Sequence, residues 1–213
     1  MAVTLTTPNT LLGAFQPKSE ASRLLTNVVL VVLGTLLLTA SAKFKIPLPP
    51  VPFTLQTLAV AVIAASAGWR VGVATVALYL AEGLAGLPVF AGATAGLPYL
   101  LGPTGGFLVA YLPMAFIIGL MADRGVAGNV ALLFVVTLVG DVVAFAAGFS
   151  WLLVVANGIT AGGGELPQWL QGGNLAEVAF NGAVKPFILW DALKMAFAAM
   201  TVAGLWAAVR KRA

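Results

Sequence analysis

An acidic and a basic side chain lie three residues apart near the end of the chain, inside a stretch that is otherwise apolar. They are Asp191 and Lys194 in the segment PFILWDALK, and the apolar stretch continues to Ala208. Helical geometry brings residues at this spacing to one face of a helix. In a bilayer each charge would cost about 2.5–3.5 kcal/mol, so the pair must face a cavity, a partner or a ligand. Ligand binding and a structural pair that satisfies itself both remain open.

The composition predicts an integral membrane protein built from helices. Of the 213 residues, 61% are hydrophobic and only 8% are charged, whereas soluble domains carry about 25% charged residues. A β-barrel would show short alternating segments, but the apolar runs here are long and rich in Ala, Leu, Val and Gly. The chain has no cysteine and no histidine, which excludes disulfides, thiolate metal sites and imidazole catalysis. We expect no cofactor and, despite a net charge of +4, no nucleic-acid partner.

The apolar runs predict a single domain of six transmembrane helices, residues 22–213, that follows a cytoplasmic N-terminal tail, residues 1–21. Runs of about 20 apolar residues suffice to cross a bilayer as a helix. The expected spans are 23–42, 54–68, 71–85, 107–121, 126–151 and 184–209.

An even number of spans places both termini on one side of the membrane. The basic residues on that side would be Lys18, Arg23, Arg70, Arg124, Arg210, Lys211 and Arg212. The opposite side would hold only Lys43, Lys45 and Lys185. Cytoplasmic loops are enriched in Lys and Arg, so this bias predicts cytoplasmic termini in the cytoplasmic membrane.

Three long, largely apolar loops would then lie on the outer side. The first, IPLPPVPF at 46–53, contains four prolines and is expected to be extended and rigid. The second, 86–106, is rich in Gly and Pro, uncharged and apolar, which favours a lid packed on protein over a flexible linker. The third covers 157–181. Together they predict an outward-facing pocket that captures a small solute.

Several side chains could bind that solute. The Lys194 ammonium could hold a carboxylate, and Asp191 could accept ligand N–H groups or neutralise Lys194. Tyr99, in the second loop, could close over a ring-shaped ligand. Gln56, after the proline loop, could form neutral hydrogen bonds.

Two further acids lie within predicted spans. Glu82 is near the outer end of its helix and is expected to reach water, whereas Asp141 lies deeper and is expected to pair with a polar residue on a neighbouring helix. An intramembrane enzyme that uses Asp141, Glu82 or Asp191 as an acid or base is therefore an alternative. It lacks two catalytic groups that clearly converge.

Three segments together resemble the BioY family of biotin-binding S components of energy-coupling factor (ECF) transporters. They are IPLPPVPFTLQTL, LAGLPVFAGATAGLPYLLGPTGGF and KPFILWDALK. The resemblance covers essentially everything after the tail. It implies an all-α S-component fold with six transmembrane helices and biotin held near the outer surface under the loops.

The resemblance also assigns residues. The family's Asp-x-x-Lys falls on Asp191 and Lys194, and its lid tyrosine on Tyr99. The stretch 86–121 lacks the asparagine and the arginine that such S components carry in or after the lid. Gly92 or Ala93 stands in place of the asparagine, which leaves the remaining contacts to backbone groups and Gln56.

Small residues of the first span would form the contact with a partner subunit. Such contacts use spaced alanines in the family, and here Gly34, Ala40 and Ala42 supply the small side chains that close helix approach needs. The implied partners are a transmembrane coupling subunit and two ATPase subunits in the bilayer.

The sequence therefore predicts a biotin-capture subunit that is not an enzyme. The chain has no P-loop, so ATP-driven uptake would need a partner. A solitary biotin facilitator is the alternative within transport.

Overall fold

The structure, a computed structural model, describes residues 9–48, 51–92 and 94–210 and is mostly helical within these ranges. Its helices are α1 (Leu11–Phe15), α2 (Glu20–Lys43), α3 (Gln56–Leu84), α4 (Leu97–Leu100), α5 (Gly105–Asp123), α6 (Val130–Ala161), α7 (Leu175–Ala183) and α8 (Ile188–Arg210). Two short strands, β1 (Lys45–Ile46) and β2 (Phe53–Thr54), pair antiparallel around the proline loop. Single 3₁₀ turns occupy Val126–Gly128 and Gln168–Leu170.

Five of the described helices are long and apolar enough to cross a membrane: α2, α3, α5, α6 and α8. Each predicted span overlaps one of these helices, although the fifth and sixth begin four residues later than predicted, at Val130 and Ile188. The predicted end of the fifth span, at 151, and the predicted start of the third loop, at 157, are wrong, because α6 continues to Ala161. The helix ends only where three consecutive glycines, 162–164, remove its helix propensity.

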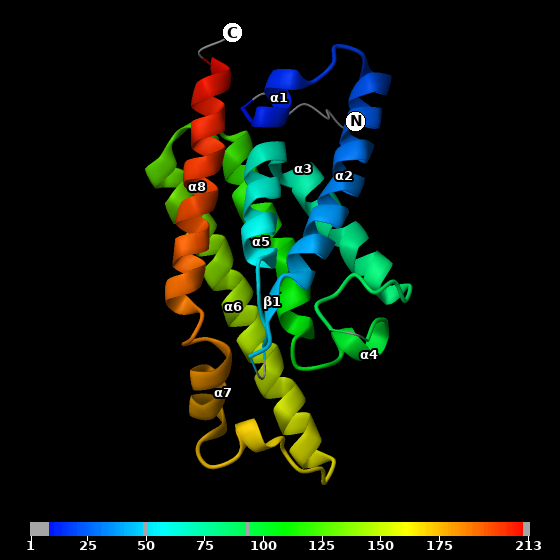
Figure 1. The fold of residues 1–213 in the computed structure, drawn as a ribbon, viewed down its shortest axis with the longest axis vertical. Coiled ribbons are helices and arrows are strands. Elements are labelled where there is room, and N and C mark those ends of the chain that lie inside the picture. The colour runs from blue at the N-terminus through cyan, green and yellow to red at the C-terminus, as the bar shows by residue number, and fades with distance from the viewer. Residues whose placement is uncertain (1–8, 49–50, 93, 211–213) are drawn as a thin grey trace.

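Helix α3 contains two of the predicted spans, joined at Gly68. Gly68 has φ 82° and ψ 173°, a non-helical combination that glycine alone adopts readily. The two halves then lie side by side, because the Gln56 side chain donates to the Tyr79 hydroxyl at 2.9 Å across 23 residues of sequence. In a continuous helix that separation would be about 35 Å. Figure 1 shows the chain reversing direction within α3.

The end of α5 holds this reversal in place. The backbone N–H of Trp69 donates to the Asp123 carboxylate at 3.2 Å, which caps the second half of α3. A Cβ on Gly119 would lie 2.4 Å from the Trp69 backbone, so α5 approaches the turn as closely as a glycine allows. The reversal is therefore built by four residues from two helices, Gly68 and Trp69 of α3 and Gly119 and Asp123 of α5.

The helices form one bundle with α3 at its centre. Helix α3 packs against α2, α5 and α8, and α6 packs against α5 and α8. Small residues such as Ala61, Ala64 and Ala198 are fully buried in the core, whereas large aliphatic side chains such as Leu36 and Val142 are exposed on the outside. Apolar side chains on the outside suit a lipid environment.

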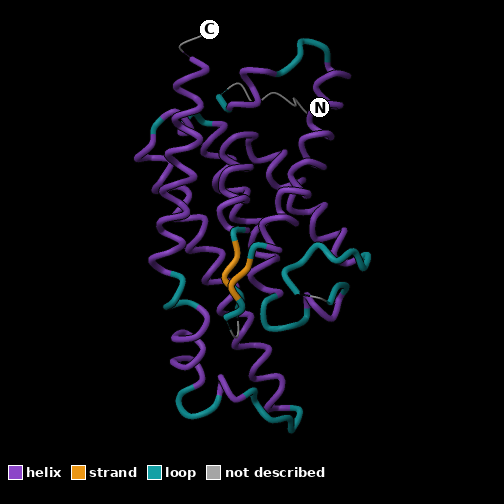
Figure 2. The backbone as a smooth tube through the Cα atoms, in the orientation of Figure 1, coloured by secondary structure: helices purple, strands orange, loops and turns teal. Residues whose placement is uncertain are grey.

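Helix α1 and the C-terminal end of α8 lie at the same end of the bundle (Figure 1). The strand pair lies away from that end (Figure 2). The described part of the predicted tail, residues 9–21, is not detached: Leu12 of α1 is buried against Ala67 and Val71, and α2 already begins at Glu20.

We predict that Gly68→Ala destabilises the fold. The new Cβ would lie 2.3 Å from Asp123 Oδ1 on a backbone with positive φ, and a backbone in such a sparsely populated region costs on the order of 1–3 kcal/mol by itself. Thermal melting of purified protein in detergent should show a lowered midpoint.

Gly204→Ala is the matched control. Gly204 is exposed within α8, and a Cβ there would meet no atom within 4 Å. That variant should melt at or slightly above the wild-type temperature, because alanine favours helix over glycine. Equal melting of Gly68→Ala and wild type would contradict the role given to the turn.

Candidate functional site

Asp191 and Lys194 form a buried ion pair on the first turns of α8. Their side chains are joined at 3.0 Å, from Lys194 Nζ to Asp191 Oδ1, and the residues are only 2% and 8% exposed. The expectation that the two charges share one helix face and turn away from lipid is confirmed.

Strand β2 and the beginning of α3 supply the other partners of the pair. The Lys194 ammonium donates to the Thr54 carbonyl at 2.8 Å and to the Thr57 hydroxyl at 3.4 Å. It also lies 3.9 Å from the centre of the Phe53 ring, where a cation is attracted to the π face. The Thr57 hydroxyl in turn donates to Asp191 Oδ1 at 2.6 Å. The ammonium thus has several partners within this chain.

The Asp191 carboxylate is not fully paired. Its Oδ2 atom is buried and has no hydrogen-bond partner among the described residues. Leaving a buried acceptor without a donor costs about 1–3 kcal/mol, more when it is charged, so such an atom in a native structure calls for an explanation. A structural pair that satisfies itself does not account for Oδ2, whereas a ligand N–H would.

Gln56 belongs to a second polar group beside the first. Its amide nitrogen donates to the Tyr79 hydroxyl, which donates to the carbonyl of Val89 in the Gly/Pro loop at 3.1 Å. Its amide oxygen accepts a 3.3 Å hydrogen bond from the Thr54 hydroxyl. Gln56 therefore links α3 to the loop 86–104.

That loop is packed as a lid, as the sequence predicted. Phe90 is fully buried, and its ring stacks on Tyr99 with 4.9 Å between centroids. The Tyr99 hydroxyl accepts the backbone N–H of Gly92 at 3.2 Å, and a Cβ on Gly92 would lie 2.5 Å from the Tyr99 ring. The absence of a side chain at Gly92 therefore leaves room for the Tyr99 ring. Ala93, the other predicted position, lies outside the described residues.

Two lysines, one at the end of α2 and one in β1, hold the lid in place. Lys43 Nζ donates to the carbonyl of Phe90 at 2.7 Å, and Lys45 Nζ donates to that of Ala91 at 2.5 Å. These bonds give a structural reason for the basic residues that follow the first span, which the sequence indicated only as markers of topology.

Two small cavities bring the candidate residues together. One, of about 40 Å³, reaches Asp191 and Lys194; the other, of about 30 Å³, reaches Gln56 and Tyr99. They share walls formed by Val51, Pro52, Thr54, Phe107 and Tyr111. Each holds only a few water-sized spaces of about 10–15 Å³. A ring-shaped ligand would therefore need the shared walls to move.

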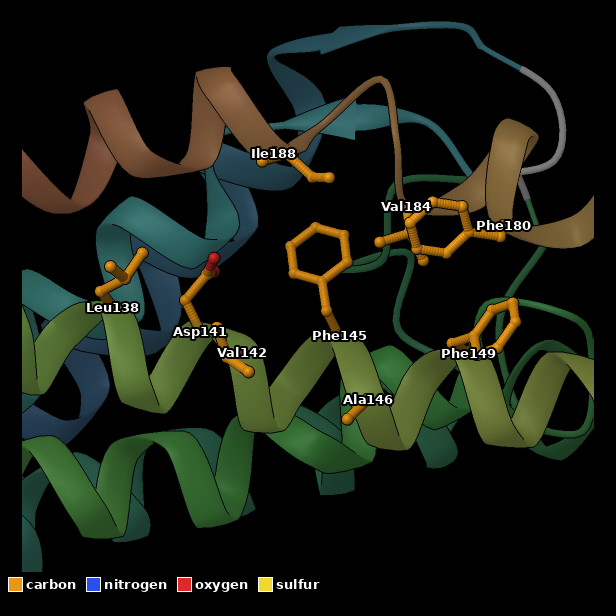
Figure 3. Close-up of a pocket in the computed structure, with 9 residues that line it drawn as sticks. All are labelled: Leu138, Asp141, Val142, Phe145, Ala146, Phe149, Phe180, Val184 and Ile188. Atoms are coloured by element: carbon orange, nitrogen blue, oxygen red, sulfur yellow. The ribbon is translucent and has the colours of Figure 1, made fainter. Parts of the chain in front are cut away.

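The remaining acids have different surroundings. Glu82 accepts a 3.1 Å hydrogen bond from the Thr35 hydroxyl of α2 and is half-buried. Asp141 is 4% exposed, but its Oδ1 has no partner among the described residues, so the structure does not provide the helix–helix bond that we expected for this oxygen. Asp141 lines an apolar groove beside α6 (Figure 3).

The three small residues of α2 are placed differently from one another. Ala42 is fully buried. Gly34 is buried against Thr75, whose Cγ2 would lie 2.6 Å from a Cβ on the glycine, and it borders a groove of about 230 Å³ between α2 and α3. Only Ala40 is exposed. The contact of these residues with a partner subunit stays a prediction.

Sequence reasoning missed several residues of the site. Thr57 and Phe53 complete the surroundings of the ion pair, and Tyr79 links Gln56 to the lid. A signal was present for Thr57, because Thr54, Gln56 and Thr57 form a polar cluster at the start of an apolar span. Tyr79 carried no such signal, since only the reversal at Gly68 brings it beside Gln56.

Comparison with solved structures gives a match over most of the chain. The protein matched is described as the S-component for biotin from an ECF-type ABC transporter, with a TM-score of 0.72 over 89% of this chain and 94% of that one. The sequences are 23% identical, so this likeness shows the shared fold.

Curated relatives agree with that match. The biotin transporter BioY of Thermotoga maritima is 41% identical over 90 residues, which is 42% of this chain and 53% of that protein. Biotin transporter BioY2 of Lactococcus lactis is 36% identical over 126 residues, 59% of this chain and 69% of that protein. The alignments thus span between about half and two thirds of these relatives.

The sequence pattern of the BioY family itself matches residues 14–211. This multi-pass membrane protein therefore belongs to the BioY family.

Proposed function

We propose that this protein captures biotin with high affinity and is the substrate-binding subunit of an ECF-type ABC transporter. The observation that carries the proposal is the buried Asp191–Lys194 pair, whose free Oδ2 acceptor lies beside a cavity under the proline loop. The names of the relatives and of the structural neighbour support biotin as the ligand.

Biotin offers a ureido ring, an apolar bicycle and a carboxylate. In the arrangement that we propose, Asp191 Oδ2 accepts a ureido N–H, because it is the unpaired acceptor of the cavity. Lys194 neutralises and orients the Asp191 carboxylate through its 3.0 Å contact with Oδ1. Phe107 and Tyr111, which line both cavities, flank the ureido ring with aromatic surfaces.

The arrangement favours binding over catalysis. The alternative of an intramembrane enzyme needs an acid or a base that lies beside a reacting group of the substrate. Glu82 instead accepts a hydrogen bond from Thr35 of α2, and the Asp191 Oδ1 atom is engaged by Lys194 and Thr57.

We further propose six membrane crossings with both termini in the cytoplasm. The reversal of α3 at Gly68 supports two crossings by that element. Arg70 and Arg124 then lie at the same end as Arg210, where cytoplasmic basic residues are expected. This places the protein in the cytoplasmic membrane with the proline loop and the lid outside.

A transmembrane coupling subunit and two ATPase subunits complete the proposed transporter. The groove between α2 and α3 is lined in part by Gly34 and would allow a partner helix to approach closely. The exposed Ala40 lies on the same helix.

The first prediction concerns binding. Wild-type protein purified from cells should carry biotin that mass spectrometry detects. Lys194→Ala should weaken biotin binding by about 2–5 kcal/mol, because the buried Asp191 carboxylate loses its counter-charge. Lys185→Ala, which removes an exposed lysine outside both cavities, is the matched control and should bind as wild type does. Normal affinity of a folded Lys194→Ala protein would remove Lys194 from the site.

The second prediction separates a subunit from a solitary facilitator. Vesicles that contain this protein together with the coupling and ATPase subunits should accumulate labelled biotin when ATP is supplied. Vesicles that contain the protein alone should bind biotin without accumulating it. Concentrative uptake or rapid equilibration by the protein alone would favour the facilitator.

The third prediction concerns topology and exploits the absence of native cysteines. Single-cysteine variants Arg70→Cys and Arg124→Cys should react with a membrane-impermeant maleimide only after the cells are permeabilised. Glu177→Cys, on α7, should react in intact cells. Labelling of Arg70→Cys from outside would disprove the proposed orientation, and its failure to react on either side would contradict two crossings by α3.

A further inference from the structure

A second space, larger than the cavity at the ion pair, is an apolar groove of about 450 Å³ along α6, lined by residues three and four apart from Leu138 to Phe149. The opposite wall comes from Phe180, Val184 and Ile188 of the segment that ends α7 and begins α8. Val142 and Ile188, both 58% exposed, form its open rim.

The groove contains one polar side chain, that of Asp141. Figure 3 shows Asp141 and Phe145 pointing from α6 toward the segment that carries Val184 and Ile188. Asp141 is only 4% exposed, and its Oδ1 has no donor among the described residues. An ionisable residue at membrane depth that faces a groove points to a functional partner.

Phe145 separates this groove from the ion-pair cavity, since it lines both. Its ring meets Phe107 edge-on at 5.8 Å and lies 5.9 Å from Phe187. Asp141 is close enough to Asp191 and Lys194 to interact with them electrostatically across this partition. Rotation of one aromatic ring would therefore join the two spaces.

The two spaces together present two buried acceptors that have no donor within the described part of the chain, Asp191 Oδ2 and Asp141 Oδ1. A cyclic urea has two N–H donors that diverge from one planar ring, and each donor can meet one of these oxygens. The ion-pair cavity, at about 40 Å³, cannot hold a bicycle with its aliphatic chain, whereas the adjoining groove can.

We propose that Asp141 is a second determinant of ligand specificity, and that the ligand's apolar body lies in the groove along α6. In this arrangement the ureido ring bridges Asp191 and Asp141, and Phe145 moves aside to admit it. This inference rests on the proposed binding of biotin and adds Asp141, Phe145 and the groove to the site.

The test uses biotin and two analogues, each methylated on a different ureido nitrogen. Asp141→Val should lower biotin affinity about tenfold or more, the usual effect of losing a hydrogen bond to a charged group. It should leave unchanged the affinity for the analogue whose methyl already blocks the nitrogen facing Asp141. Asp141→Asn, which keeps a carbonyl acceptor, should retain most of the biotin affinity. Equal loss for biotin and both analogues, or no loss, would overturn the role of Asp141.

A second variant tests the groove without touching a polar residue. Ala146→Trp places a large ring in the groove and should weaken biotin binding at least about tenfold, whereas Val139→Trp, exposed on the same helix outside the groove, should not. Unchanged affinity in Ala146→Trp would show that the ligand does not occupy the groove. Failure of wild-type protein to bind biotin would refute the proposed function itself, whereas wild-type binding with unaffected variants would refute only this inference.

Discussion

The ammonium group of Lys194 has to find its hydrogen bonds inside the protein, because lipid offers none. It obtains them from Asp191 on its own helix, from Thr54 of β2 and from Thr57 at the start of α3. This requirement binds α8 to the end of the proline loop, with the Phe53 ring against the same charge. Segments separated by about 140 residues of sequence are thereby held at one point. A buried pair of this kind is weak evidence for stability, but it specifies which segments meet.

The reversal at Gly68 brings further residues to this site. It returns α3 to the same end of the bundle, so that Tyr79 lies beside Gln56 and carries a hydrogen bond to Val89 in the lid. Phe90 then packs edge-on against Tyr79 and face to face with Tyr99. The lid is therefore continuous with the core of α3 through one aromatic cluster, and Lys43 and Lys45 secure its backbone from the other side.

The function of this protein is indicated by buried polar atoms that lack a hydrogen-bond partner among the described residues. Lys194, Gln56, Tyr79 and Tyr99 all have partners within the chain, whereas one oxygen each of Asp191 and Asp141 has none among the described residues. In a membrane, where water does not compensate for a missing partner, unpaired buried acceptors are costly. Two of them around adjoining spaces suit a ligand that brings donors, which is the chemistry of the proposed ureido ligand.

The sequence by itself determined the class of the protein, most of its membrane helices and the charged pair at its site. Apolar run length and the rarity of charge act locally, so they can be read without a fold, and the family segments located the lid and Asp191–Lys194. Tertiary structure alone decided that Tyr79 meets Gln56, that Thr57 and Phe53 surround Lys194, and that Gly34 and Ala42 are buried within the chain. It also decided that Asp141 opens onto a groove. These relations depend on which helices touch and at what height, and the backbone reversal at Gly68 sets that height for α3.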